Sequence, residues 1–228
     1  MNALALIAVS VGLCAFMRFA DKKIGMPGLI ALSAMCMVRL SVTAGIPIDI
    51  GGLKSNFGCL LYAPVIFATA LCHCRYGPHS AWRQVRAVFG AVAVGAVVIE
   101  AAKGFAGPSA NRDALVVLLD VSWRVIGASF GAFLVANIAC LGMLRSGRGP
   151  VLAQIVAQAF DSIVFFPLAF YGVPGFPLIE TMLAGFAIKS GIALLAAPLM
   201  WGVKREEAAT NHLLKTATVQ FNRLLSQP

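Results

Sequence analysis

Charged residues are scarce in this sequence, and acidic residues are the scarcer sign. Only 12% of the 228 residues are charged, and Asp and Glu together number nine. Soluble domains usually carry about 25% charged residues. Hydrophobic residues make up 60% of the chain, and its mean hydropathy is +0.87. This shortage of charge excludes an ordinary soluble domain and indicates an integral membrane protein.

The common catalytic motifs are also missing. The chain contains no Walker A, G-x-S-x-G or H-E-x-x-H motif, so nothing supports an ATPase, a serine hydrolase or a metalloprotease. The run Cys72-His73-Cys74 looks metal-like, but adjacent helical residues point in different directions and no second pair matches it. We interpret the six cysteines, which lie in or beside apolar runs, as small buried residues. We therefore expect no enzyme activity, no metal and no cofactor.

Apolar stretches of membrane-spanning length recur along the chain. A spanning helix needs about 20 mostly apolar residues. This criterion predicts seven helices, at roughly 3–20, 28–47, 57–74, 87–105, 121–144, 151–171 and 181–202. The expected fold class is all-α, a polytopic membrane helical bundle of about seven transmembrane helices. Residues 1–204 would form the transmembrane domain, and residues 205–228 a cytoplasmic tail that is amphipathic or disordered.

The positive residues alternate between the joints that connect these helices. Of 18 Lys and Arg residues, 12 fall in the first, third and fifth joints and in the tail. The intervening joints and helix ends carry only Lys54, Lys103 and Arg112. The positive-inside rule then predicts an external N-terminus and a cytoplasmic C-terminus. Although the net charge is +9, no basic patch interleaved with aromatics is present, so we expect no nucleic-acid partner.

A few ionisable residues fall inside the predicted helices. A charge at the bilayer centre costs about 2.5–3.5 kcal/mol, so such residues face the bundle interior or a water-filled cavity and have partners. They are Arg39 in the second helix, Asp161 in the sixth and Lys189 in the seventh. Arg124 lies near the outer end of the fifth helix, four residues after Asp120, with which it can pair.

The sixth predicted helix carries a polar stripe. Gln154, Gln158, Asp161 and Phe165 are spaced by four, three and four residues, which places them on one helical face. The opposite face, which includes Phe166, is apolar. One interpretation is a substrate site at a midplane cavity, with Asp161 balanced by Lys189 or Arg39. The other is a static salt bridge that only holds helices together.

Three stretches together resemble a known family. They are Leu61–Ala81, Ala157–Gly172 and Ile188–Lys204, and they are similar to the vitamin uptake transporter family, whose members include queuosine-precursor transporters. The family's S-Q-x-x-D-[ST]-x-x-F pattern is matched here from Gln158 to Phe165 through Asp161 and Ser162. Its last helix carries a Lys and a Pro, matched by Lys189 and Pro198, and Arg124 matches a family arginine. The resemblance covers roughly residues 55–204.

The resemblance implies import of 7-cyano-7-deazaguanine or a related deazapurine across a bacterial inner membrane. Together with the intramembrane charges and the polar stripe, this gives the expected substrate-binding residues Asp161, Gln158, Phe165, Lys189, Arg39, Arg124 and Gln154, with Phe130 or Tyr62 as the opposite wall of the ring site. Many members read T-D-x-x-x-E-x-Y-G in the first stretch, whereas Ala70 and Cys74 stand at the two acidic positions here. The exact substrate is therefore left open.

Two other functions are compatible with the same residues. The chain is alternatively the substrate-binding component of an energy-coupling-factor vitamin transporter for another small heterocycle, or a membrane scaffold that transports nothing. Co-purification with an ATPase module would identify the first, and loss of folded protein rather than of uptake in Asp161→Asn would identify the second. A homo-oligomer and an energy-coupling module are the partners left open, besides the lipid bilayer and the substrate.

Overall fold

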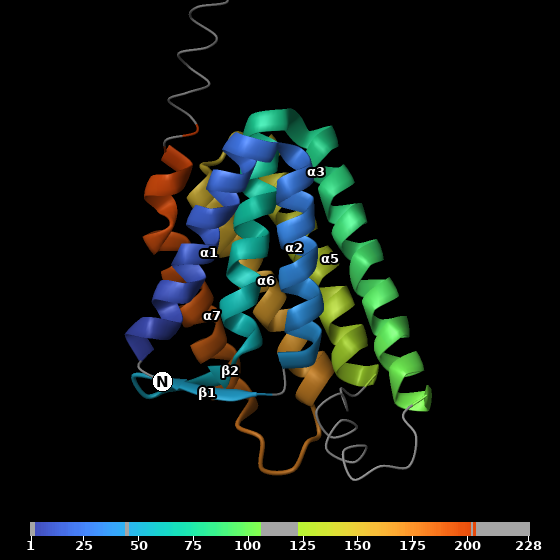
Figure 1. The fold of residues 1–228 in the computed structure, drawn as a ribbon. Helices are drawn as coiled ribbons and strands as arrows, with labels where there is room; N and C mark the ends of the chain where they lie inside the picture. The colour runs from blue at the N-terminus through green and yellow to red at the C-terminus, as the bar shows by residue number, and fades with distance from the viewer. Residues whose placement is uncertain (1–2, 44–45, 106–122, 202, 204–228) are drawn as a thin grey trace, which may run out of the picture.

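Helices dominate the structure, a computed structural model that describes residues 3–43, 46–105, 123–201 and 203. The helices are α1 (Ala3–Ile24), α2 (Met26–Thr43), α3 (Gly58–Phe105), α5 (Trp123–Arg145), α6 (Pro150–Phe170) and α7 (Leu178–Leu195). They run up and down along one common direction (Figure 1). The predicted all-α bundle is therefore confirmed as a class. The predicted tail, 205–228, lies outside the described residues.

Helix α3 is two helices joined by a sharp kink. Gly77 has φ +82° and ψ 174°, a conformation outside the helical region that glycine reaches without strain. Pro78 follows at the first position of the second segment, where its missing N–H and fixed φ are tolerated. The sequence predicted a joint from Tyr76 to Arg86, and this is wrong, because the helix resumes at once. With the two segments counted separately, the described residues hold seven helices.

A β-hairpin interrupts the helical pattern between α2 and α3. Strands β1 (Pro47–Ile50) and β2 (Leu53–Asn56) pair antiparallel. Gly51 and Gly52 form the turn with φ +62° and +88°, the positive values that a tight two-residue hairpin turn requires. The predicted helix at 28–47 is therefore too long, since α2 ends at Thr43 and Pro47 begins a strand.

The surface and lengths of the helices are those of a multi-pass membrane protein. Among the described residues, five helices are long and apolar enough to cross a membrane: Leu4–Ile24, Gly58–Val98, Arg124–Arg145, Pro150–Phe170 and Leu178–Leu195. A shorter apolar helix spans Met26–Leu40. Large apolar side chains are exposed on several of these helices, including Phe16, Val97, Ile163 and Leu194. Such a surface is stable only against lipid or another apolar partner.

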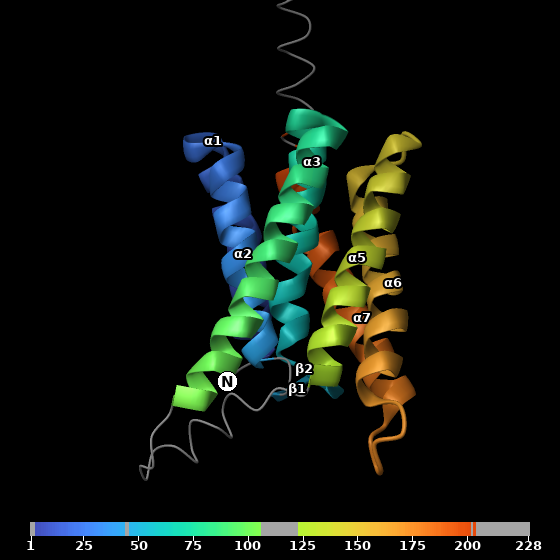
Figure 2. The same ribbon diagram turned by 90° about the vertical axis from the view of Figure 1, so that its right-hand side faces the viewer.

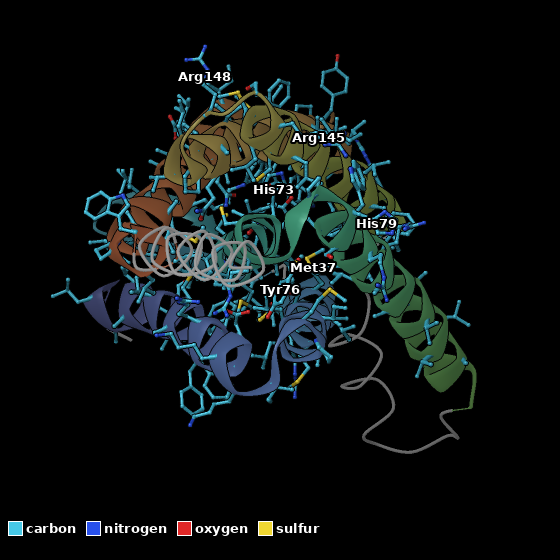
Figure 3. All side chains as sticks on the ribbon, turned by 90° about the horizontal axis from the view of Figure 1, so that it is seen from above. Met37, His73, Tyr76, His79, Arg145 and Arg148 are labelled. Carbon is cyan, nitrogen blue, oxygen red and sulfur yellow. The ribbon has the colours of Figure 1, made fainter. Side chains whose placement is uncertain are left out.

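The first segment of α3 runs through the middle of the bundle. Helices α1 and α2 lie on one side of it, and α5, α6 and α7 on the other (Figures 2 and 3). This central position follows from its composition, because Val65, Ile66, Phe67 and Leu71 are all buried. The central segment thus faces the polar stripe of α6 as well as α7, the two helices that carry Asp161 and Lys189.

The joints rich in positive charge gather at one end of the bundle. The turn after α1, the kink of α3 and the loop after α5 all lie at the upper end in Figure 1, opposite the hairpin. At this end Asp21 is buried and accepts hydrogen bonds from Arg18 and Arg75, both at 2.9 Å, and from the Tyr76 hydroxyl at 2.8 Å. This network ties α1 to the α3 kink.

Candidate functional site

A buried ion pair lies at the centre of the candidate site. Lys189 Nζ of α7 donates to Asp161 Oδ2 of α6 at 2.5 Å. Lys189 is only 1% exposed and Asp161 6% exposed. Taking two charges out of water is costly, and an attraction at this distance offsets that cost only when both groups are present. The sequence left Lys189 and Arg39 as candidate partners of Asp161, and in the structure the partner is Lys189.

The ion pair borders a small cavity at the junction of six elements. The cavity is lined from α2, the hairpin, the central α3 segment, α5, α6 and α7. Its lining residues are Met37, Leu40, Asn56, Gly58, Cys59, Tyr62, Ser129, Asp161, Phe165, Phe166 and Lys189. Segments far apart in the sequence therefore converge on one carboxylate and one ammonium group.

Aromatic rings form much of the wall around the pair. Phe165 and Phe166 pack edge to face with centroids 5.3 Å apart. Lys189 Nζ lies 5.5 Å from the ring centroid of Tyr62, within the range of a cation–π contact. Of the two opposite walls predicted, Tyr62 lines the cavity, whereas Phe130 packs against Phe89 with centroids 4.6 Å apart.

Phe166 corrects the predicted division of α6 into a polar and an apolar face. It was expected on the apolar face opposite the polar stripe, but it is fully buried and lines the same cavity as Asp161. The reason is the close packing of α7: a Cβ at Gly185 would lie 2.9 Å from Phe166 Cε2. Because glycine has no Cβ, α7 approaches closely enough to cover a second strip of α6.

The two predicted glutamines are buried on α6, on the side of the cavity toward Pro150. Gln158 is fully buried, and neither its Nε2 nor its Oε1 has a hydrogen-bond partner. Gln154 donates from Nε2 to the Pro150 carbonyl at 3.2 Å, while its Oε1 has no partner. The Ser162 hydroxyl is also buried without a partner. Buried polar atoms are normally paired, so this stretch of α6 has unused hydrogen-bonding capacity beside the ion pair.

The structure does not bring the two predicted arginines to the cavity. Arg39 is exposed on α2 and is not among the lining residues. Arg124 is exposed at the start of α5, where it donates to the carbonyls of Leu168 at 2.7 Å and Tyr171 at 2.6 Å. It thus binds the C-terminal end of α6, a usual place for a cation. Its predicted partner Asp120 lies outside the described residues.

Two polar lining residues were not singled out from the sequence. Ser129 of α5 donates its hydroxyl to the Val125 carbonyl at 2.9 Å, so its oxygen can accept only. Asn56 of β2 reaches the cavity because the hairpin folds back against α7. The Gly51-Gly52 pair between short apolar stretches is a hairpin signal that could have pointed to Asn56.

The cavity is small in this structure. Its volume is about 20 Å³, which is room for about one water molecule. Pockets that hold small organic molecules have volumes of about 300–1,000 Å³. A heterocycle can therefore reach the ion pair only when the surrounding helices move apart.

Comparisons with known proteins agree with this architecture. The sequence model of the family described as "Putative vitamin uptake transporter" matches residues 56–203, close to the range expected from the sequence motifs. A protein of Bacillus subtilis (strain 168) named "Probable queuosine precursor transporter" is 22% identical over 202 residues, covering 81% of this chain and 86% of that protein. No solved structure matches. The family match includes the central α3 segment, α5, α6 and α7, and therefore the chain belongs to the vitamin uptake transporter family.

Proposed function

We propose that this chain imports a queuosine precursor, 7-cyano-7-deazaguanine or a related deazapurine, across the inner membrane of a bacterium. The observation that carries the proposal is the Asp161–Lys189 pair, buried at a cavity with aromatic walls between α3, α6 and α7. The family is one of transporters, and the Bacillus subtilis relative is named for this substrate class.

The chemistry of the pair suits a guanine-like heterocycle. The edge of such a ring presents two neighbouring N–H donors, and one carboxylate can accept both in charge-assisted hydrogen bonds. Asp161 would take this role after exchanging its bond to Lys189 for bonds to the substrate. Phe165 or Tyr62 would stack on the flat ring, and Gln158 would supply amide groups that have no hydrogen-bond partner in this structure.

The membrane topology completes the proposal. All seven helices would cross the bilayer, with each segment of α3 crossing once. The hairpin would lie on the external side, and the end that carries Arg18, Arg75, Arg145 and Arg148 would lie in the cytoplasm.

Complementation of queuosine synthesis tests the proposal. Cells that lack precursor synthesis and their own transporter would receive a low external concentration of the precursor and express this chain. We expect queuosine to appear in tRNA with the wild type and to be lost with Asp161→Asn at equal membrane abundance. Glu180→Gln is the matched control, since it makes the same chemical change at an exposed carboxylate on α7 and should leave uptake intact.

Three outcomes would count against it. Absence of queuosine with abundant, folded wild type would show another substrate or a missing energy-coupling module, which co-purification of an ATPase would reveal. Full uptake by Asp161→Asn would show that the carboxylate is not the substrate anchor. Equal loss with Glu180→Gln would show that the defect is not specific to the cavity.

A further inference from the structure

Asn56 occupies an unusual position between the hairpin and the cavity. It is the last residue of β2 and is only 8% exposed. Its Oδ1 accepts hydrogen bonds from the backbone N–H of Cys59 at 3.2 Å and from the Cys59 thiol at 3.4 Å. Its Nδ2 has no hydrogen-bond partner, although the side chain lines the same cavity as Asp161 and Lys189.

The two halves of this side chain have different explanations. The oxygen binds an N–H group at the start of α3, as the side chain of a helix N-cap does, and Ser, Thr or Asp would do the same. The amide nitrogen contributes nothing to that cap, and burying a donor without a partner costs free energy. Neither capping nor packing therefore explains why an amide stands here.

The donor complements the other groups at the cavity. Asp161 offers acceptors, Ser129 has committed its hydroxyl hydrogen to α5, and Asn56 Nδ2 is a neutral donor without a partner at the same cavity. A neutral donor beside a carboxylate matches a ring edge on which a carbonyl oxygen adjoins N–H donors. Guanine-like heterocycles present this arrangement, and purines without a carbonyl at that position do not.

We propose that Asn56 Nδ2 donates a hydrogen bond to the ring carbonyl oxygen of the transported deazapurine, so that the hairpin residue distinguishes oxo-substituted heterocycles from others. This inference rests on the proposed function. Two elements would then recognise the edge of the substrate ring. Asp161 of α6 would accept hydrogen bonds from the N–H groups, and Asn56 of β2 would donate one to the carbonyl oxygen.

Binding of two ligands by the purified full-length chain tests this assignment. The probes are 7-cyano-7-deazaguanine and its 6-thio analogue, which keeps both N–H donors but replaces the carbonyl oxygen by sulfur, a weak acceptor. We expect the wild type to bind the oxo compound about fivefold to tenfold more tightly, the ratio that one neutral hydrogen bond provides. In Asn56→Ser the two affinities should become equal to within about twofold, through weaker binding of the oxo compound alone.

Two further variants keep the test decisive. Asn56→Asp preserves the cap with an almost identical shape, so it serves if Asn56→Ser folds poorly, and it should also lose the preference. Asn137→Ser is the matched control: Asn137 is a fully buried asparagine that donates to the Phe133 carbonyl and does not line the cavity. It should keep the wild-type ratio of affinities.

The results separate this inference from the proposed function. Equal affinity of wild type for both ligands, or an unchanged preference in both Asn56 variants, would overturn the role of Asn56 while leaving deazapurine binding intact. Failure of folded wild type to bind either ligand would overturn the proposed function, and the role of Asn56 with it.

Discussion

Replacing Lys189 and Asp161 singly and together measures what the buried pair contributes. Lys189→Met leaves a carboxylate without its cation, and Asp161→Leu leaves an ammonium group without its anion, both at a site that is 1–6% exposed. Removing one partner of a buried pair costs about 3–5 kcal/mol, whereas replacing both by apolar residues of similar volume is often neutral. We expect each single variant to lose about this much and the double variant to recover to within about 1 kcal/mol of wild type.

Thermal unfolding of the purified protein in one detergent is the assay. For a chain of this size, 1 kcal/mol corresponds to a shift in Tm of about 2–4 °C, so each single variant should unfold about 6–20 °C below wild type. The double variant should unfold within a few degrees of it. If the stability loss of the double variant equalled the sum of the two single losses, the view that the two charges act as one unit would be refuted.

Uptake by the double variant separates the two interpretations of Asp161. A static salt bridge can be replaced by apolar packing, so uptake would survive in the double variant. A substrate anchor cannot be replaced in this way. We therefore expect the double variant to be folded but inactive in uptake. A double variant that still takes up the substrate would contradict the proposed role of Asp161.

Four further substitutions test the surrounding structure by the same unfolding assay. Gly185→Val should lower the free energy of unfolding by about 2 kcal/mol, because a Cβ at this position would lie 2.9 Å from Phe166. Gly191→Ala should lower it by less than about 0.5 kcal/mol, because no atom lies within 4 Å of a Cβ there. Asp21→Asn removes a buried negative charge that lies 2.9 Å from both Arg18 and Arg75, and it should cost about 3 kcal/mol while uptake per folded molecule is kept. Arg124→Gln loses its bonds to the end of α6 and should cost about 1–2 kcal/mol without changing substrate affinity.

The helical part of the fold was predictable because the bilayer restricts what a chain can do. A spanning segment must satisfy its backbone groups internally, so an apolar run of sufficient length becomes a helix almost irrespective of detail. The sequence left two candidates for the partner of Asp161, Lys189 and Arg39. The choice depends on which face of α2 turns inward, and α2 has apolar residues on all sides, so its periodicity could not place Arg39 on the exposed face.

The hairpin and its contribution to the cavity were missed for a different reason. Strands of four residues carry little periodic signal, and Pro47 to Asn56 was interpreted as the end of a helix followed by a joint. The position of Asn56 depends on long-range packing of β2 against α7, which no local pattern encodes. The sequence also did not predict the helical kink at Gly77, because a Gly-Pro pair beside several charged residues is equally typical of a loop.

The small cavity and the buried pair together constrain how a carrier of this kind would work. With Asp161 bound to Lys189, both charges are compensated, and the cavity has room for about one water molecule. Pulling the pair apart in a dry interior would leave two uncompensated charges, so separation must coincide with the arrival of new partners. A substrate that offers N–H donors to Asp161 and a ring face to Lys189 supplies them, and after its release the pair re-forms. Under the proposed function, the same two charges that bind the substrate would thus favour the paired arrangement seen here whenever no substrate is bound.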